Sequence, residues 1–240
     1  MQHPHSPTST PPVLSAAGLV KRYGETTALD DVNLTVRSGE SVAIMGASGS
    51  GKTTLLHVLA GITVPDAGDV RFTGRSGPVA VPQLSDAERS RLRREEFGFV
   101  FQQGFLLPEL TAAENVALPL LMNGAKKNAA REHSLGWLAA LGLAGMEDRR
   151  PGQLSGGQAQ RVAIARAQAT GASVTFADEP TGALDSVTSD EVMTALLQST
   201  TGQRRSLVVV THDESVAARC SRVVRMRDGR VHADSGAGAR

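Results

Sequence analysis

Short apolar segments alternate with segments of helical periodicity along most of this chain. Apolar or alternating runs of the length of strands lie at residues 19–20, 32–36, 41–45, 69–73, 98–101, 173–177 and 207–211. Helical spacing of apolar positions lies at residues 52–60, 86–94, 111–143, 158–170 and 186–200. The pair Asp228-Gly229, within residues 223–231, is a two-residue turn typical of a β-hairpin. Strands that alternate with helices predict an α/β fold, with a largely parallel sheet and helices on both faces.

Local changes in this pattern divide the chain into regions. Residues 88–150 are almost purely helical in pattern, which predicts a helical subdomain inserted into the α/β core. Residues 1–14 are rich in Pro, Ser and Thr, so we expect a disordered tail there, and residues 235–240 predict a second flexible tail. Because no internal repeat is present, residues 15–234 are expected to form one domain.

Composition narrows the classes of partner. Lys and Arg number 25 and Asp and Glu number 24, a net charge of +1, and a nucleic-acid-binding protein would show a basic excess. No nucleic acid partner is therefore expected. Cys220 is the only cysteine, so no disulfide forms within the chain. Since no run of about 18 apolar residues occurs, any membrane span is expected to come from another chain.

A phosphate-binding loop is the first candidate for chemistry. The sequence GASGSGKT lies between the predicted strand 41–45 and the predicted helix 52–60, which is the context that such a loop requires. Lys52 is expected to reach the β- and γ-phosphates, and the Thr53 hydroxyl to ligate Mg²⁺. The alternative is a chance glycine-rich turn, which the flanking elements disfavour. The expected nucleotide-binding residues are Gly46, Ala47, Ser48, Gly49, Ser50, Gly51, Lys52, Thr53 and Thr54.

Acidic residues and a histidine end two further predicted strands. Asp178 and Glu179 follow the run 173–177, where an open α/β sheet places its chemistry. Asp178 would hold Mg²⁺, and Glu179 would orient or deprotonate the attacking water. His212 ends the next run and can contact the γ-phosphate and this water. The alternatives are a helix cap or exposed turn for the acidic pair and a structural role for the histidine.

The pentapeptide LSGGQ, Leu154 to Gln158, lies between the phosphate loop and the acidic strand end. With these motifs in this order, the chain resembles the ATP-binding cassette family from Ser15 to about Val231. The resemblance implies a phosphate-loop NTPase core with a mainly parallel sheet, an antiparallel β subdomain and the inserted helical subdomain. It also implies an ATPase that uses ATP and Mg²⁺ and that dimerises with a second copy of itself around two ATP molecules.

The resemblance also assigns roles to single residues. Tyr23 matches the aromatic residue that stacks on adenine, although a lone aromatic also serves packing. Gln102, favoured over Gln103 by the Phe-x-Phe-Gln register, matches the glutamine that senses the γ-phosphate and Mg²⁺. His212 matches the switch histidine, and Asp185 matches the loop that crosses the dimer interface. The signature residues that contact the ATP of the other subunit are Ser155, Gly156, Gly157 and Gln158, whose alternative role is a flexible turn that begins a helix.

Two stretches, 84–94 and 98–116, are similar to the macrolide-exporter and lipoprotein-releasing ATPases. These ATPases work with four-helix permeases, so a permease on a separate chain is the expected partner. The ATPase is then expected in the cytoplasm, on the inner face of the plasma membrane. Phe105, Leu106, Leu107 and Pro108 either pack the helical subdomain or line the groove for the permease.

Three other functions remain open at this point. A cell-division ATPase that regulates wall hydrolases would have much the same cassette sequence. A soluble cassette ATPase acting on DNA or ribosomes would carry long coiled coils or a second cassette with a charged linker, and this chain has neither. An importer subunit is disfavoured by the 84–108 stretch.

Overall fold

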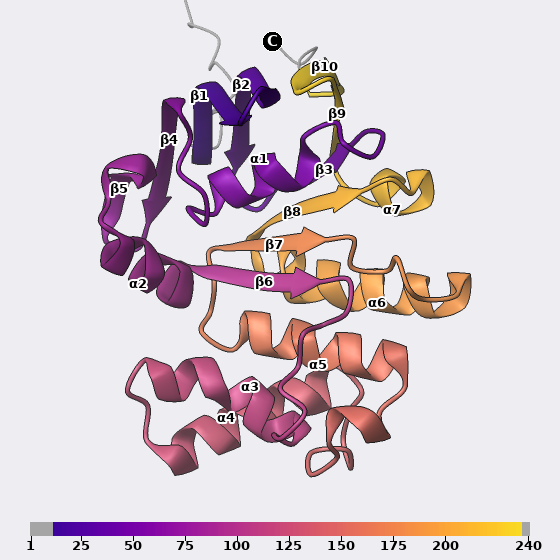
Figure 1. Cartoon of the computed structure of the whole chain (residues 1–240). Coiled ribbons are helices and arrows are strands. Elements are labelled where there is room, and N and C mark those ends of the chain that lie inside the picture. The colour runs from indigo at the N-terminus through magenta and orange to yellow at the C-terminus, as the bar shows by residue number, and fades with distance from the viewer. Residues whose placement is uncertain (1–11, 237–240) are drawn as a thin grey trace, which may run out of the picture.

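The chain forms two β-sheets with one helix between them in the computed structural model, which describes residues 12–236 (Figure 1). The antiparallel sheet has the strand order β2-β1-β4-β5. The second sheet has the order β10-β9-β3-β8-β7-β6 and is parallel from β9 to β6. The strands are β1 (Pro12–Tyr23), β2 (Thr26–Arg37), β3 (Ser41–Met45), β4 (Ala67–Gly74), β5 (Gly77–Ala80), β6 (Phe97–Phe101), β7 (Val174–Asp178), β8 (Ser206–Thr211), β9 (Arg222–Arg227) and β10 (Arg230–Asp234).

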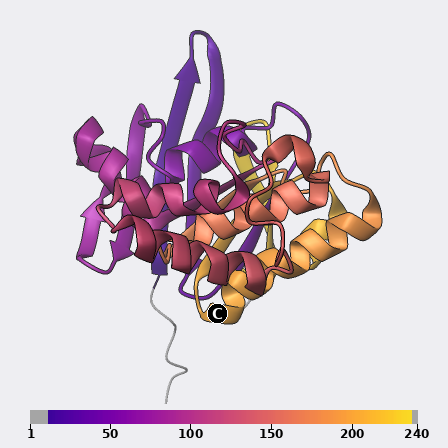
Figure 2. The same ribbon diagram turned by 90° about the horizontal axis from the view of Figure 1, so that it is seen from below.

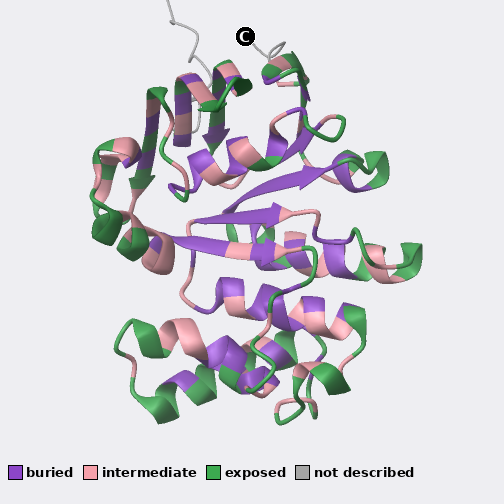
Figure 3. Ribbon diagram, in the orientation of Figure 1, coloured by how far each residue is buried: buried purple, intermediate pink, exposed green. Residues whose placement is uncertain are grey.

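Helices cover both faces of the parallel sheet. Helix α1 lies between the two sheets, α5 and α6 lie on the other face, and α3 and α4 pack against α5 (Figures 1 and 3). The helices are α1 (Lys52–Leu59), α2 (Asp86–Glu96), α3 (Ala112–Met122), α4 (Lys127–Ala140), α5 (Gly156–Gln168), α6 (Ser186–Ser199) and α7 (Glu214–Ala218), with short 3₁₀ turns at Val81–Gln83, Pro151–Gln153 and Thr201–Gln203. Within residues 12–236, no helix has the length and apolarity to cross a membrane. The expected α/β fold with parallel and antiparallel sheets is confirmed.

Strand β8 shows why the central strands are apolar throughout. All six of its residues are buried, because both faces of the sheet are covered. Val208 and Val210 face the core that contains α1, whereas Leu207 and Val209 face the core that contains α5 and α6. Every side chain of such a strand is therefore buried, and its polar residues are left to its ends, where the site lies.

The inserted helical region is smaller than the sequence predicted. Helix α2 packs against β6, and its Leu92 contacts the core around α1. Strand β6 pairs with β7 at the edge of the parallel sheet, from Phe97 opposite Val174 to Phe101 opposite Asp178. Only α3 and α4 of residues 88–150 belong to the separate helical layer. The expectation of a helical block from residue 88 was wrong. The charged sequence of α2 looks like that of an exposed helix in the helical subdomain, but α2 packs against the edge of the parallel sheet.

The tails are also shorter than expected within the described residues. Strand β1 begins at Pro12, and Val13 and Leu14 are buried, so order does not begin at residue 15. At the other end, the Ser235 amide donates to Val223 O at 2.9 Å, and the Gly236 amide donates to Asp234 Oδ1 at 2.9 Å. The remaining expected tail residues, 1–11 and 237–240, lie outside the described part of the chain.

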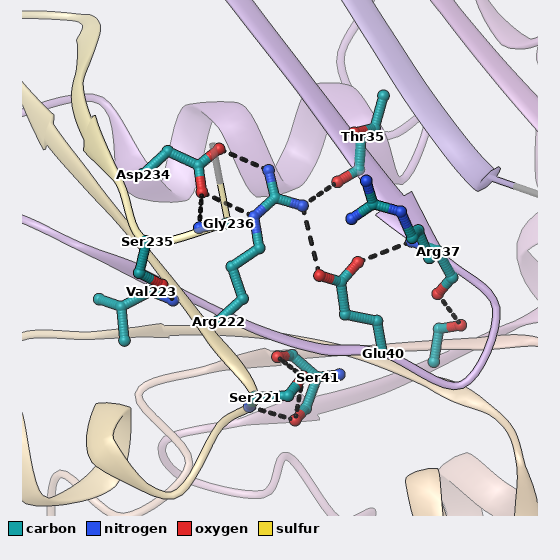
Figure 4. A network of polar contacts seen from close by, with 11 residues as sticks. Thr35, Arg37, Glu40, Ser41, Ser221, Arg222, Val223, Asp234, Ser235 and Gly236 are labelled. Carbon is teal, nitrogen blue, oxygen red and sulfur yellow. Dashed lines mark hydrogen bonds and ion pairs between the residues drawn. The ribbon is translucent and has the colours of Figure 1, made fainter. Parts of the chain in front are cut away.

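The C-terminal hairpin of β9 and β10 is anchored at its base by Arg222, whose side chain is 8% exposed (Figure 4). Its guanidinium bonds both carboxylate oxygens of Asp234, Glu40 Oε1 at 3.3 Å and Thr35 O at 2.8 Å. At the tip, the predicted Asp228-Gly229 turn has positive φ at both residues. The Gly229 amide donates to Ser50 O at 3.2 Å, so this hairpin supports the loop between β3 and α1.

Candidate active site

The loop between β3 and α1 turns tightly because glycine occupies its crowded positions. A Cβ atom at Gly46 would lie 2.4 Å from Met226 O, and one at Gly51 would lie 2.3 Å from Ala28 O. Lys52 begins α1, and its ammonium donates to Gly46 O and Ala47 O at 2.8 Å each. The loop is thus held between β2 and β9, with its lysine folded over it.

A cavity of about 610 Å³ opens beside this loop. Its lining combines the loop, the start of α1, the first residues of β2 and the ends of two central strands. The lining residues are Thr26, Thr27, Ala28, Ser48, Gly49, Gly51, Lys52, Thr53, Thr54, Glu179 and His212. The structure thereby brings together the predicted phosphate loop, the predicted base and the predicted histidine. The β2 residues were missed, because nothing in their sequence shows that β2 packs beside the phosphate loop.

Glu179 and His212 form a pair at the edge of this cavity. His212 Nδ1 lies 2.8 Å from Glu179 Oε1, and the Thr211 hydroxyl donates to Glu179 Oε2 at 3.4 Å. Glu179 has φ of 48° and donates its amide to Val210 O at 2.9 Å, which turns its backbone sharply at the end of β7. Both carboxylate oxygens are therefore oriented by the end of strand β8 and the residue that follows it, and the side chain of Glu179 is held while His212 stays exposed.

A second cavity, of about 380 Å³, adjoins the first and shares Thr53 and Glu179 with it. Asp178 lies in this cavity, and the Thr53 hydroxyl donates to its Oδ1 at 3.5 Å. Burial raises the pKa of the Asp178 carboxyl above its usual value, and the bond from Thr53 opposes part of that rise. Gln102, Gln103 and Phe105 complete the lining with Phe101. A hydroxyl and a partly desolvated carboxylate at this distance fit a small divalent cation, which prefers hard oxygen ligands.

The signature residues lie apart from both cavities. Ser155 is the N-cap of α5: its hydroxyl accepts from the Gln158 amide at 3.3 Å, and Gln158 Oε1 accepts from the Ser155 amide at 2.9 Å. Ser155 and Gly156 are exposed, whereas Gly157 is buried against α6. The N-terminus of α5 carries the partial positive charge of the helix and is open to solvent. Within residues 12–236, neither of the two cavities is lined by a residue of this helix end.

Asp185 and Tyr23 also lie outside the two cavities. Asp185 is the exposed N-cap of α6, and its carboxylate accepts from the Thr188 amide at 3.0 Å, which lowers its pKa. Tyr23 is 53% exposed at the end of β1, with the Lys21 ammonium 5.6 Å from its ring centre. It precedes the turn to β2, and the β1–β2 hairpin extends away from the helices (Figure 2). The adenine-stacking role of Tyr23 stays a prediction.

Comparison with known proteins identifies the family of this chain. The family model described as ABC transporter matches residues 29–182. The chain belongs to the ABC transporter family. The resemblance predicted from the motifs is confirmed at the level of the family. The chain is 44% identical over 231 residues to a macrolide export ATP-binding/permease protein MacB of Hyphomonas neptunium, covering 95% of this chain and 35% of that protein.

A further relative and solved structures are similar to most of the chain. The chain is 46% identical over 226 residues to a probable syringafactin export ATP-binding/permease protein, SyfD, of Pseudomonas syringae, covering 92% of this chain and 34% of that protein. It spans about a third of the length of these relatives. Among solved structures, the cassette MJ0796, a dimer bound to ADP and Pi, gives a TM-score of 0.82 at 39% identity, covering 92% of this chain and 97% of that one. CbiO1 of Clostridium perfringens gives 0.82 at 28% identity, covering 93% and 88%.

Proposed function

We propose that this chain hydrolyses ATP to power a membrane permease, through a dimer of two copies closed around two ATP molecules. The observation that carries the proposal is the division of the site. The phosphate loop, Glu179 and His212 line one cavity, whereas the signature at Ser155 faces solvent elsewhere on the same chain. A second copy supplies the missing half if its signature helix points into this cavity.

The phosphate loop holds the triphosphate in this proposal. Its backbone amides and the N-terminus of α1 bind phosphate oxygens, because both present partial positive charge. Lys52 lines the cavity and exchanges its bonds with Gly46 O and Ala47 O for oxygens of the β- and γ-phosphates. The N-terminus of the partner's α5 offers a further positive end to the γ-phosphate.

Glu179 orients and deprotonates the water that attacks the γ-phosphate. Thr211 and His212 fix the direction of its carboxylate before the nucleotide arrives, so little reorganisation is needed at the moment of reaction. His212 then contacts the γ-phosphate from the cavity edge. Catalysis of this kind depends mainly on positioning and electrostatics, because the phosphoryl group passes to water without a covalent intermediate.

Thr53, Asp178 and Gln102 would hold Mg²⁺ in the second cavity. The Thr53 hydroxyl and Asp178 Oδ1 lie 3.5 Å apart, and Gln102 borders the same space. When bound, the ion neutralises the developing charge on the β- and γ-phosphate oxygens. Asp178 supports this assignment, because its desolvated carboxylate gains from a cation that replaces the lost water.

A permease of the macrolide-export or lipoprotein-releasing type is the proposed partner. Supporting this, the relatives carry "ATP-binding/permease" in their names. The loop after Gln102 is apolar and open: Phe105 is 62% and Leu107 is 42% exposed. Such side chains are expected to be covered by a partner. We therefore place the cassette at the cytoplasmic face of the plasma membrane, held there by the permease.

Two variants test the division of the site. Lys52→Ala is expected to lose ATP turnover, measured as phosphate release, and normal turnover in it would refute the phosphate-loop assignment. Ser155→Arg is expected to impair hydrolysis while the monomer still binds ATP, because the arginine blocks only the half supplied to the partner. Glu132→Arg on α4, an exposed charge change away from both cavities, serves as the control and should hydrolyse ATP normally. Unchanged turnover in Ser155→Arg would remove the signature from the site.

A further inference from the structure

Arg166 holds the loop that follows β6 from the far end of helix α5. Its Nη1 donates to Phe105 O and its Nη2 donates to Gly104 O, each at 2.7 Å. No carboxylate of residues 12–236 forms an ion pair with it, and burial alone lowers the pKa of its guanidinium. Removing a guanidinium from water costs free energy, and the hydrogen bonds to these two carbonyl oxygens offset part of that cost.

The loop has a backbone conformation that needs such support. Gly104 has φ of 67° and Phe105 has φ of 44°, so two successive residues have left-handed backbone conformations. This conformation is unfavourable for Phe105, because its side chain is bulky. Phe105 is 62% exposed, and the ring contact recorded for it is edge-on to Phe101, with ring centres 5.4 Å apart. A second side chain of α5 assists, because Gln160 Nε2 donates to Phe101 O at 2.8 Å, beside the Gly104 amide, which donates to the same oxygen at 2.9 Å.

This loop carries a wall of the second cavity. Gln102 and Phe105 share that cavity with Thr53, Asp178 and Glu179. Gln102 is exposed and lies in the turn that the bond from the Gly104 amide to Phe101 O closes. Its side chain also lies against Gly182, where a Cβ atom would be 3.0 Å from Gln102 Nε2. A shift of about 1 Å in a group that positions reacting atoms can cost roughly 100-fold in rate.

We propose that Arg166 is a positioning residue for ATP hydrolysis: by bonding Gly104 O and Phe105 O, it keeps Gln102 beside Thr53, Asp178 and Glu179. This inference rests on the proposed ATPase function. Arg166 does not touch the nucleotide-binding loop, so its loss acts on turnover and leaves the affinity for ATP, set by the first cavity, nearly unchanged.

The test compares Arg166→Met, Arg166→Lys and the control Arg94→Met in the whole chain. Arg94 belongs to α2 and lines the same surface pocket as Arg166, but it donates to Asn123 Oδ1 at 2.7 Å and not to the loop at 104–105. Arg166→Met is expected to lower kcat by about 10- to 100-fold with KM within about 2-fold of the original chain. Arg166→Lys should recover part of kcat, because one ammonium still reaches a carbonyl. Arg94→Met should leave both constants within about 2-fold.

Amide hydrogen exchange of the nucleotide-free proteins gives a readout without turnover. Arg166→Met is expected to speed exchange at residues 101–106 by about 10-fold or more, with residues 46–53 unchanged. Equal exchange in this segment, or a kcat equal to that of the original chain, would overturn the proposal. If Arg166→Met does not fold, the kcat of Arg166→Lys and its amide exchange at residues 101–106 test the proposal instead. Absence of turnover in the original chain would refute the ATPase proposal, while exchange still decides whether Arg166 holds the loop.

Discussion

Gly157 of the signature is predicted to be required for packing as well as for the partner's nucleotide. A Cβ atom at Gly157 would lie 2.4 Å from Thr188 Cγ2 of helix α6. Thr188 does not turn away freely, because its hydroxyl donates to Asp185 Oδ2 at 2.7 Å and its amide donates to Asp185 Oδ1 at 3.0 Å. Gly157→Ala therefore forces α5 and α6 apart or breaks the N-cap of α6.

The size of the effect follows from two opposing terms. Overpacking of a close contact costs about 1–3 kcal/mol. Alanine is favoured over glycine inside a helix by about 1 kcal/mol, and by less at this position in the first turn. We expect Gly157→Ala to lower the free energy of unfolding by about 1–2 kcal/mol. Thr188→Ser removes Cγ2 and keeps the hydroxyl that bonds Asp185, so Gly157→Ala should cost almost nothing in that background.

Urea unfolding followed by circular dichroism, on the four proteins of this double-mutant cycle, measures the coupling. Gly136→Ala in α4 is the matched control: a Cβ there meets nothing within 4 Å, and the change should be neutral or stabilising. Additive effects of Gly157→Ala and Thr188→Ser, within about 0.5 kcal/mol, would refute the packing argument. ATP turnover of the double variant separates the two roles, because a nucleotide contact stays lost after stability returns.

The remaining predictions concern charge. Burial raises the pKa of Asp178, so the ionised carboxylate destabilises the folded state at pH 7. Asp178→Asn should therefore raise the Tm of the nucleotide-free chain at pH 7, and it should abolish hydrolysis. The difference in Tm should vanish below about pH 4, where the carboxyl is protonated in both the folded and the unfolded chain. A lower Tm at pH 7 would contradict this. Arg222→Met leaves Asp234 and Glu40 without their cation and should cost about 3–5 kcal/mol in urea unfolding at pH 7. Because Arg222 lowers the pKa of Asp234, this cost should shrink as pH falls below about 4, and a constant cost would be evidence against the ion pair.

Sequence reasoning located the elements whose local pattern is strong. The strand, glycine loop and helix around residues 41–60, and the Asp228-Gly229 turn, are formed by neighbours in the chain, so their sequence shows them. The long strands β1 and β2 were recognised only in part. Register shifts between them, together with positive φ at Gly18 and Asp31, break the alternation that marks a strand.

Contacts between distant elements were beyond prediction from one sequence. The β2 residues that line the nucleotide cavity, the bonds from Arg166 to the loop at 104–105, and the approach of Gly157 to Thr188 all depend on how elements pack. The segment 98–101 was recognised as a strand, but its place in the parallel sheet was missed, because its sequence does not show that it pairs with β7. Gln102, Asp178 and His212 were easier to bring together, because each ends or directly follows a strand of the parallel sheet.

Assembly of the ATP-bound dimer tests the central claim most directly. Glu179→Gln keeps the cavity and its contacts but removes the base, so bound ATP should persist and hold two copies together. Sedimentation velocity of Glu179→Gln with Mg²⁺ and saturating ATP should show a dimer, and the Glu179→Gln, Ser155→Arg double variant should remain monomeric while binding ATP. A Glu179→Gln protein that stays monomeric with ATP bound would contradict the division of the site between two chains.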